Sequence, residues 1–592
     1  MTPPPLPPGT PAQGDDPGAA FATVDPAARV PPSSEVSSSD APAAGCVLAD
    51  SAPVSAQSAP VWHDQPGPWD RWSPSRQEQP ALRWREVLSV LLLVVLADLT
   101  VYRGQGFAGC AALFLIAPGL LLLGSPCRRL GPGWWIVVAM VVLLAGRMIW
   151  LGSVLGTAVG LALLVASAMA IAGRRLYVLD IAAYALQTIV AGGVGTVHYA
   201  GSAGQLSPKV VRVHWLSVVL PLAAVALFGT LFILANPDLA TSLGDMLNRV
   251  MRSLLDSIER LSLSWEEVVF WLFTAWVAIG LLRPVIRRSV LARFSTEGQP
   301  AADKAPVWAE ATLYPALRNT LLALIVLFAV YLVFEFKTLW FRVFPKGFYY
   351  AGYAHEGAAW LTASLALATV VLSLIFRGDV LRDPRLPRLR RLAWIWSAEN
   401  LVLAATVYNR LWIYVTFNGM TRMRTVALFG VSAVVAGVVL VVWKIGSNRD
   451  FVWLLRRHLA ALALVVYLFA LTPVDALVHA YNVRRVLAGD LAPSVQISVH
   501  PVNAEGILVL PPLLESDNEI IREGIRAMLA ERAIQFEGWA RQEDQHWTAF
   551  QVADRLLSER LRAMRADWAA YLDPSKRTAA LDRFHQYVYQ WY

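Results

Sequence analysis

The polar residues inside the apolar segment 392–415 are the first candidates for chemistry in this sequence. Glu399 and Arg410 stand about three helical turns apart, so a helix would carry both on one stripe, about 16 Å apart along its axis. Asn400 and Asn409 flank them. Because a charge at the centre of a bilayer costs from about 3 to about 10 kcal/mol or more, each charged group needs a partner from another helix or from water. Two interpretations stay open: a polar pocket or conduit inside a bundle, or interhelical hydrogen bonds that fix the packing.

Other polar motifs stand beside apolar segments, but they complete no catalytic or metal-binding pattern. The pair His355 and Glu356 would begin an H-E-x-x-H zinc motif, yet Ala359 occupies the position of the second histidine. Asp475 and His479, at i and i+4, offer two ligands, whereas a zinc site takes three or four. The sequence contains no P-loop, dinucleotide-binding glycine motif, serine-hydrolase elbow or kinase signature. We therefore predict no catalytic residue, no metal and no cofactor.

The composition shows what must position these residues. Of the 592 residues, 56% are hydrophobic and 16% are charged, and the mean hydropathy is +0.48. Soluble domains have about 45–50% apolar and about 25% charged residues, so a soluble enzyme and a coiled coil fit poorly. Three cysteines are too few and too scattered for a disulfide framework. The net charge of +8 comes mostly from loop arginines, so we expect the lipid bilayer, and no nucleic acid, as a partner.

Apolar runs recur from Trp84 onward, and crossing a hydrocarbon layer of about 30 Å takes about 20 such residues. The candidate spans are 87–103, 107–124, 133–151, 153–172, 176–197, 215–235, 265–282, 316–335, 357–376, 392–415, 425–443 and 458–472. In lipid each must be helical, because an open sheet edge would leave backbone polar groups unsatisfied. The sequence therefore predicts an all-α, polytopic transmembrane helix bundle of eleven or twelve spans.

The distribution of Lys and Arg among the loops predicts the side on which each loop lies. Basic residues concentrate at 83–85, 128–129, 174–175, 283–304, 377–391 and 444–457, and we expect these loops in the cytoplasm. The two halves of the chain then disagree by one crossing. The disagreement disappears if 176–197, which carries Asp180 and the Gly192–Gly193 pair, is re-entrant or only partly inserted. Eleven spans, with the N-terminus cytoplasmic and the C-terminal domain on the outer side, is the first prediction; twelve is the second.

Composition divides the chain into three parts. Residues 1–82 are rich in Pro, Ala and Ser and cannot bury enough apolar surface to fold, so we expect a disordered tail. Residues 83–472 are predicted to form the bundle, with an amphipathic interfacial helix over 239–262. Residues 473–592 are predicted to form an extramembrane, mostly helical C-terminal domain. Its opening segments SVQISVH and GILVLPP leave strand or extended chain open, helical patterns follow Leu514, and the fold of 490–540 stays open.

Five motifs occur in a fixed order: ANPDL (235–239), FYYAGYAHEGAAWL (348–361), YVTFNGMTRMR (414–424), DALVHAYNVRR (475–485) and HWTAFQVADRLL (546–557). Through them the chain, over 215–565, resembles a bacterial integral-membrane family described as domain of unknown function 4173, with its 4153-type relatives. The resemblance implies a multi-span protein of the bacterial cytoplasmic (inner) membrane and no established activity. It marks these polar residues as candidate functional positions: Tyr353, His355, Glu356, Thr421, Arg422, Arg424, Asp475, Tyr481, Asn482 and Arg484.

Three classes of function stay open. We prefer a non-enzymatic membrane scaffold or signalling component whose C-terminal domain contacts a protein partner, because no catalytic set is complete. A transporter or channel lined by the polar stripe is the second hypothesis, and a membrane-embedded enzyme acting on lipid or envelope material, with Glu356 or Glu399 as general base, is the third. Substrate and oligomeric state stay open. If the stripe is special, Glu399→Gln should impair folding or function more than Glu267→Gln at a segment end.

Overall fold

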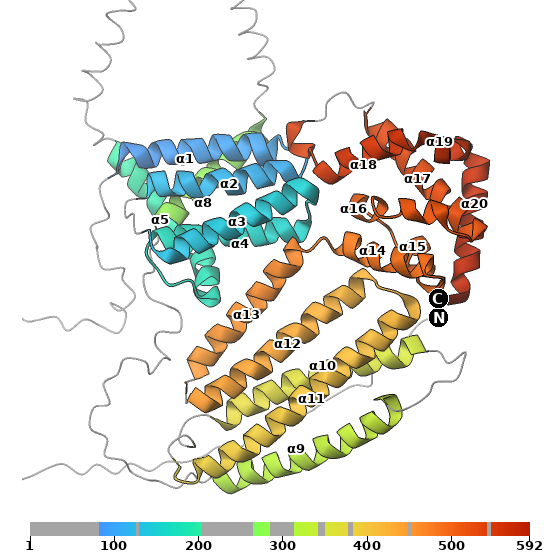
Figure 1. Ribbon diagram of the computed structural model, residues 1–592. Coiled ribbons are helices and arrows are strands. Elements are labelled where there is room, and N and C mark those ends of the chain that lie inside the picture. Colours follow the sequence, from blue (N-terminus) through green and yellow to red (C-terminus); the bar gives the residue numbers. More distant parts are fainter. Residues whose placement is uncertain are drawn as a thin grey trace, which may run out of the picture. The chain divides into compact units, whose positions relative to one another are not determined.

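The structure is a computed structural model that describes residues 82–125, 130–203, 264–283, 313–340, 350–376, 383–447, 451–540 and 546–591, together with positions 380 and 449. Within these residues the regular elements are all helices, which confirms the predicted fold class (Figure 1). Almost all of the predicted tail 1–82, the predicted span 215–235 and the predicted amphipathic helix 239–262 lie outside the described residues.

Six helices from the N-terminal half pack together and are called the first helix group. They are α1 (Trp84–Ala97), continued by the π-helical turn η1 (Asp98–Tyr102), α2 (Phe107–Gly124), α3 (Pro132–Leu151), α4 (Val154–Ile171), α5 (Val178–Ala203) and α8 (Trp265–Leu282). Local sequence explains where several begin: Pro132 occupies the first turn of α3, and the hydroxyls of Ser153 and Ser264 cap α4 and α8. Buried Phe114 and Met148 lie in the shared apolar core of α2, α3 and α4.

Five helices from the second half form the second helix group. They are α9 (Tyr314–Glu335), continued by η2 (Phe336–Trp340), α10 (Tyr350–Ile375), α11 (Leu386–Asn418), α12 (Arg422–Ser447) and α13 (Phe451–Leu471). Trp396 of α11 is the largest side chain of their core and packs with Leu321 and Val441. α13 joins the two groups, because the Tyr467 hydroxyl donates to the carbonyl oxygen of Met140 in α3, at 2.9 Å.

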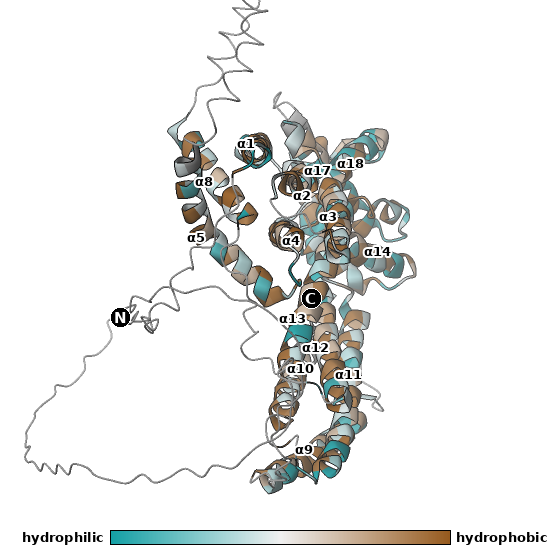
Figure 2. Cartoon of the chain, turned by 90° about the vertical axis from the view of Figure 1, so that its left-hand side faces the viewer, coloured by the Kyte–Doolittle hydropathy of each residue, from teal (hydrophilic) through white to brown (hydrophobic). Residues whose placement is uncertain are grey.

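Each predicted apolar segment other than 215–235 coincides with one of these helices. Among the described residues, nine helices are long and apolar enough to cross a membrane. α1 is not among these nine because it has 14 residues before it continues as η1, and α11 is not among them and carries Glu399 and Arg410 in its centre. Figure 2 shows apolar residues along the helices of both groups and more polar residues on the helices that follow α13. The chain is therefore a membrane protein built from many apolar helices.

The basic loops gather at one end of both helix groups. α1 and α8 run antiparallel, because Arg283 at the end of α8 pairs with Glu86 at the start of α1. Arg456 at the start of α13 lies over the ring of Tyr177, which directly precedes α5. We call this the basic end, and it carries Arg83, Arg175, Arg283, Arg388, Lys444, Arg449 and Arg456. The opposite end, which includes the turns 103–106, 152–153 and 418–421, is called the junction end.

α5 lies across the basic end, so it differs from its neighbours. The Tyr184 hydroxyl donates to the carbonyl oxygen of Leu281, 2.8 Å away, and the Tyr199 hydroxyl donates to Glu86, 2.7 Å away. Both partners belong to the basic ends of their helices, as does the partner of Tyr177. Length and composition alone would allow α5 to span a membrane. α5 is one continuous helix without a re-entrant break, and the choice between eleven and twelve spans stays a prediction.

Cysteine accessibility can check the position of α5. In a chain whose native cysteines are replaced, Arg175→Cys and Gly201→Cys mark the two ends of α5, and space is open around Gly201. We expect a membrane-impermeant thiol reagent to label both from the same side as Arg388→Cys, and Glu559→Cys from the other side. Labelling of Arg175→Cys and Gly201→Cys from opposite sides would mean that α5 crosses the bilayer.

The chain after α13 folds into a separate helical layer, the C-terminal domain. It contains α14 (Val474–Leu487), η4 (Ala492–Ser494), α15 (Val495–Ser498), α16 (Ala504–Ile507), η5 (Pro511–Glu515), α17 (Glu519–Ala540), η6 (Trp547–Ala549), α18 (Val552–Ala563), α19 (Arg565–Trp568), η7 (Ala569–Leu572), α20 (Pro574–Val588) and η8 (Tyr589–Trp591). Ile497, Leu513, Ile525 and Phe584 are almost fully buried in its core. The described residues between 490 and 540 are therefore short helices and turns followed by α17, and not the strands that the sequence had left open.

Candidate binding chamber and domain junction

The predicted polar stripe on α11 does not form a single site. Arg410 is buried and donates to both carboxylate oxygens of Glu335 on α9, each at 2.6 Å. Asn400 is also buried and donates to the carbonyl oxygen of Trp396, one turn earlier on its own helix, at 2.8 Å. Glu399 and Asn409 are half-buried, and one carboxylate oxygen of Glu399 has no hydrogen-bond partner among the described residues. Within the stripe, Arg410 therefore joins α11 to α9, whereas Asn400 forms a hydrogen bond within α11.

Sequence reasoning missed the partner of Arg410. Glu335 is the last residue of the segment 316–335, where an acidic side chain looks like a span end. The sequence did contain a signal that Glu335 needs a partner, because it is the acidic residue of an otherwise apolar segment. Glu267, chosen as the unimportant comparison for Glu399, is buried and pairs with Arg103. The expected order of effects is therefore reversed, and Glu267→Gln should be the more harmful change.

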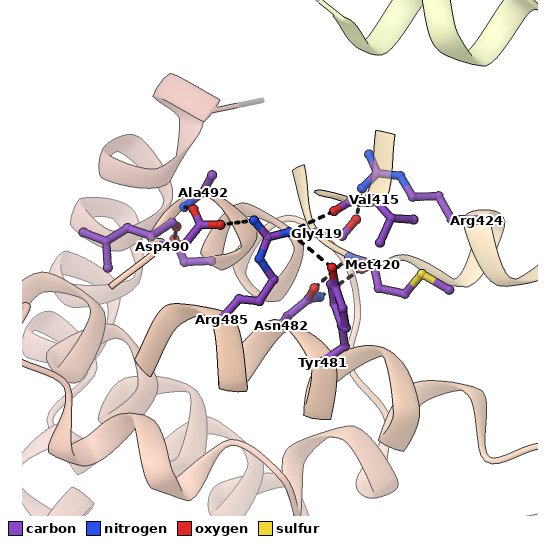
Figure 3. A network of polar contacts seen from close by, with 11 residues as sticks. Val415, Gly419, Met420, Arg424, Tyr481, Asn482, Arg485, Asp490 and Ala492 are labelled. Carbon is purple, nitrogen blue, oxygen red and sulfur yellow. Dashed lines mark hydrogen bonds and ion pairs between the residues drawn. The ribbon is translucent and has the colours of Figure 1, made fainter. Parts of the chain in front are cut away.

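The turn between α11 and α12 is held by α14 (Figure 3). Gly419 has φ +85°, which favours glycine, and an added Cβ would lie 2.7 Å from the Asn482 side chain. Asn482 is buried; it accepts from the Met420 N–H at 2.7 Å and donates to the Met420 carbonyl at 2.9 Å. Arg485 donates to the Val415 carbonyl oxygen and pairs with Asp490. These bonds fix α14 to the junction end of α11.

A second set of bonds starts on α12. Arg422 donates to both oxygens of Asp475, which is 2% exposed, and Asp475 also accepts from the Asn503 N–H at 3.2 Å. Arg424 is buried, lies 3.7 Å from the centre of the Tyr414 ring and donates to the Gly419 carbonyl oxygen. The first residues of α12 therefore contact both its own turn and the C-terminal domain.

The first helix group is tied to the same domain. Arg147 of α3 forms an ion pair with Glu505 of α16, with 2.6 Å between the charged atoms, and both are largely or fully buried. The Gln105 N–H donates to the Thr548 hydroxyl at 2.9 Å, and the Gly152 N–H donates to the Gln551 side chain. Sequence reasoning did not single out Arg147 or Glu505, although a lone arginine in the apolar segment 133–151 indicated that this residue needs a polar partner. Both helix groups thus hold the C-terminal domain at the junction end.

A chamber of about 820 Å³ lies between the second helix group and the C-terminal domain. α10, α11 and α12 supply apolar walls, including Ala358, Val407, Leu411 and Val431. Its polar end is formed by Tyr414, Arg422, Arg424, His479, Gln496 and His500. The volume is within the range of about 300–1,000 Å³ that is typical of small-molecule sites. Neither Glu399 nor Arg410 contributes to its lining, so the chamber is distinct from the predicted stripe.

His479 is the most deeply buried titratable group of the chamber, with 3% of its surface exposed. Its Nδ1 atom has no hydrogen-bond partner among the described residues. Burial lowers the pKa of His479 to about 4; Arg422 and His500 act in the same direction, whereas Asp475 opposes them. Burial also lowers the pKa of His500, with help from Arg424 and Arg422. At neutral pH both imidazoles are therefore uncharged, and the arginines carry the positive charge of the chamber.

The depressed pKa of His479 predicts a loss of stability in acid. The folded pKa of about 4 lies below the unfolded value of about 6.5, so the unfolded chain takes up the proton first as the pH falls. His479 does not lower the free energy of unfolding above about pH 6.5. Below that pH the loss of unfolding free energy grows, to about 3 kcal/mol near pH 4. We expect His479→Gln to flatten this part of the pH dependence in detergent unfolding measurements. Parallel curves for the two proteins would contradict the prediction.

The residues marked by the family resemblance converge here only in part. Thr421, Arg422 and Arg424 line the chamber. Asp475 and Asn482 support it from α14, where Tyr481 is half-buried and Arg484 is exposed. Tyr353, His355 and Glu356 belong to the first turns of α10, and their side chains lie outside the described residues. The described residues contain no group of three His, Cys, Asp or Glu side chains placed to hold a metal ion.

Comparison with known proteins gives one family. Residues 131–500 match the family described as Domain of unknown function (DUF4153). No curated protein and no solved structure matches the chain. The match begins before the range 215–565 predicted from the motifs, so it includes α3, α4 and α5. It ends at His500, in the polar end of the chamber. Because the matched residues make up more than half of the chain, it belongs to the DUF4153 family.

Proposed function

We propose that this chain is a non-enzymatic membrane scaffold or signalling component that holds its C-terminal domain in a fixed position at one membrane face. The proposal rests on two ion pairs, here called clamps, that join the C-terminal domain to the helix groups. Arg147–Glu505, from the first group, is largely buried; in Arg422–Asp475, from the second, Asp475 is buried and Arg422 is half-exposed. Buried polar contacts of this kind are geometrically demanding, so they favour one relative position of two packed parts. A domain held in this way is suited to present a surface to a protein partner.

We further propose that the membrane is the bacterial cytoplasmic membrane, with the C-terminal domain on the outer side. The support is the gathering of Arg83, Arg175, Arg388 and Arg449 at the end opposite to this domain. Loops rich in Lys and Arg stay preferentially in the cytoplasm. The exposed rings of Trp547 and Phe550, beside the turn at Gln105, are of the type that anchors a domain at a membrane interface.

Asp475→Asn is expected to loosen the C-terminal domain. The change removes the carboxylate that accepts from Arg422 and from Asn503. Hydrogen bonds to a charged group contribute about 1.5–3 kcal/mol, and the half-exposed Arg422 places the effect at the lower end of this range. We expect at least about tenfold faster hydrogen exchange in α14 and α16 of the full chain. Arg583→Gln, at an exposed ion pair within the same domain, should leave both helices protected.

Site-specific photocrosslinking in cells tests the scaffold itself. A photoreactive residue at Arg555 or Glu559, both exposed on α18, should give the same discrete protein adduct from both positions. The same residue at Leu327, which is exposed on the apolar α9, should give none. Asp475→Asn should weaken the α18 adduct. If scans of all exposed faces of the C-terminal domain give no protein adduct, the scaffold proposal is wrong.

A further inference from the structure

We propose that the chamber binds a membrane amphiphile with a phosphate-bearing, anionic head group, with the head at Arg424 and the acyl chain along the apolar walls. The inference goes beyond the scaffold role, because it concerns a ligand site that the scaffold does not require. Three independent features of the chamber support it: an uncompensated cation, a helix start, and a hydrocarbon-like wall on the membrane side.

The first feature is the charge of Arg424. Its side chain is 5% exposed and lines the chamber, where a tyrosine ring and a backbone carbonyl are its partners. Arg422 is already matched by Asp475, whereas no carboxylate among the described side chains pairs with Arg424. A buried charge is costly unless an opposite charge compensates it. An anion in the chamber would supply this charge, and guanidinium groups suit phosphate because they donate several hydrogen bonds in one plane.

The second feature is the start of α12. This helix of 26 residues begins at Arg422, and Thr421, Arg422, Met423 and Arg424 all line the chamber. The N-terminal end of a helix carries partial positive charge and free N–H groups, so it favours an anion. Buried His479, whose Nδ1 is unpartnered, lines the same end and would offer one more hydrogen bond. The polar end of the chamber is thus built from several groups that all suit an acidic head group.

The third feature is the wall. Val407 and Leu411 come from α11, Ala427 and Val431 from α12, and Ala358 from α10. α10 and α12 are long and apolar enough to cross the membrane, so we expect this wall to continue into the hydrocarbon layer. A free inorganic anion would leave such a wall uncovered, whereas an acyl chain would cover it. The combination therefore favours a lipid over a small water-soluble phosphate.

Glycine positions allow the head and the tail of the ligand to be tested separately. A side chain added at Gly430, which lines the chamber, meets no other atom within 4 Å. Gly430→Leu should therefore fill the apolar part without disturbing the fold. Gly146 on α3 has equally open surroundings and lies outside the chamber, so Gly146→Leu is the matched control. For the head group, Arg424→Gln removes the charge, and Arg388→Gln at the exposed basic end is the matched control.

The test is native mass spectrometry of the full chain, titrated with dioleoyl phosphatidate, with dioleoyl phosphatidylcholine and with inorganic phosphate. We expect one phosphatidate per chain, retained at least about tenfold more tightly than phosphatidylcholine. Arg424→Gln and Gly430→Leu should each weaken phosphatidate binding at least about tenfold, and Arg388→Gln and Gly146→Leu should leave it unchanged. Melting curves of all variants in uncharged detergent identify any that fail to fold, and Arg424→Lys, which keeps the charge, should retain partial binding.

Several outcomes would overturn the proposal. Equal retention of phosphatidate and phosphatidylcholine would show that the chamber does not distinguish their head groups. Binding of inorganic phosphate as tightly as phosphatidate, with Gly430→Leu without effect, would indicate a site for free anions. None of these outcomes touches the clamps at Asp475 and Glu505, so the scaffold proposal stands or falls separately.

Discussion

Glu335→Gln should destabilise the full-length protein by about 3–5 kcal/mol, the range measured when one partner of a buried ion pair is removed. Arg410 would keep its charge in a site where 4% of its side chain is exposed, but would lose the opposite charge and one of the two oxygens to which it donates. Tyr331, which donates to Glu335 at 3.0 Å from one turn earlier, would lose a charged acceptor. The surroundings cannot easily relax, because Arg410 lies against Gly357 of α10, where even a Cβ would overlap it.

The measurement is unfolding in mixed micelles, monitored by tryptophan fluorescence, with Glu399→Gln as the matched control. The control makes the same isosteric change on a half-buried carboxylate without a strong partner, so its effect should stay within about 1 kcal/mol. The double change Glu335→Leu with Arg410→Met should recover most of the lost stability, because a well-packed apolar pair can replace a buried ion pair. If Glu335→Gln and Glu399→Gln cost the same, the pair is not a structural centre of the second helix group.

The positions of the helices could be predicted because their signal is local. Lipid requires about 20 apolar residues and internal backbone hydrogen bonding for each span, so segments such as 107–124 and 133–151 coincide closely with α2 and α3. The basic loops were also assigned to a common side from composition alone, and the structure gathers Arg175, Arg283 and Arg388 at one end. Periodicity did not resolve the start of 490–540, because the helices and turns before α17 have fewer residues than the pattern needs.

The chamber could not be predicted, because it depends on pairings between distant residues. Asp475 and Arg422 stand 53 positions apart. Arg147 lies near the start of the family match, whereas Glu505 comes just after its end. The sequence shows each residue as polar but carries no information on which partner neutralises it. The stripe at Glu399 and Arg410 illustrates this. Their regular spacing suggested one shared site, but Arg410 pairs with Glu335 on α9, and one carboxylate oxygen of Glu399 has no hydrogen-bond partner among the described residues. Arg424 became informative only when its surroundings were known.

Glu86→Gln should also cost about 3–5 kcal/mol, and it should release α5. Glu86 is 1% exposed and accepts from Arg283, with 2.8 Å between the Arg283 Nη2 and a carboxylate oxygen, as well as from the Tyr199 hydroxyl. One carboxylate therefore joins α1, α8 and α5 at the basic end. Tyr199→Phe, which removes a single hydrogen bond, should cost about 1–2 kcal/mol and is the graded control. The double change Glu86→Leu with Arg283→Met should restore stability but not the position of α5.

The readout that separates this effect from general destabilisation is thiol labelling at Gly201→Cys, near the end of α5. Glu86→Gln should accelerate it at temperatures where tryptophan fluorescence still reports a folded protein, because α5 loses its bond to α1 before the bundle opens. Since Glu86 and Glu335 belong to different helix groups and share no partner, the two destabilisations should add within about 0.5 kcal/mol in Glu86→Gln with Glu335→Gln. A clearly smaller sum would mean that the two groups do not carry separate polar centres. Unchanged labelling would mean that Glu86 does not hold α5.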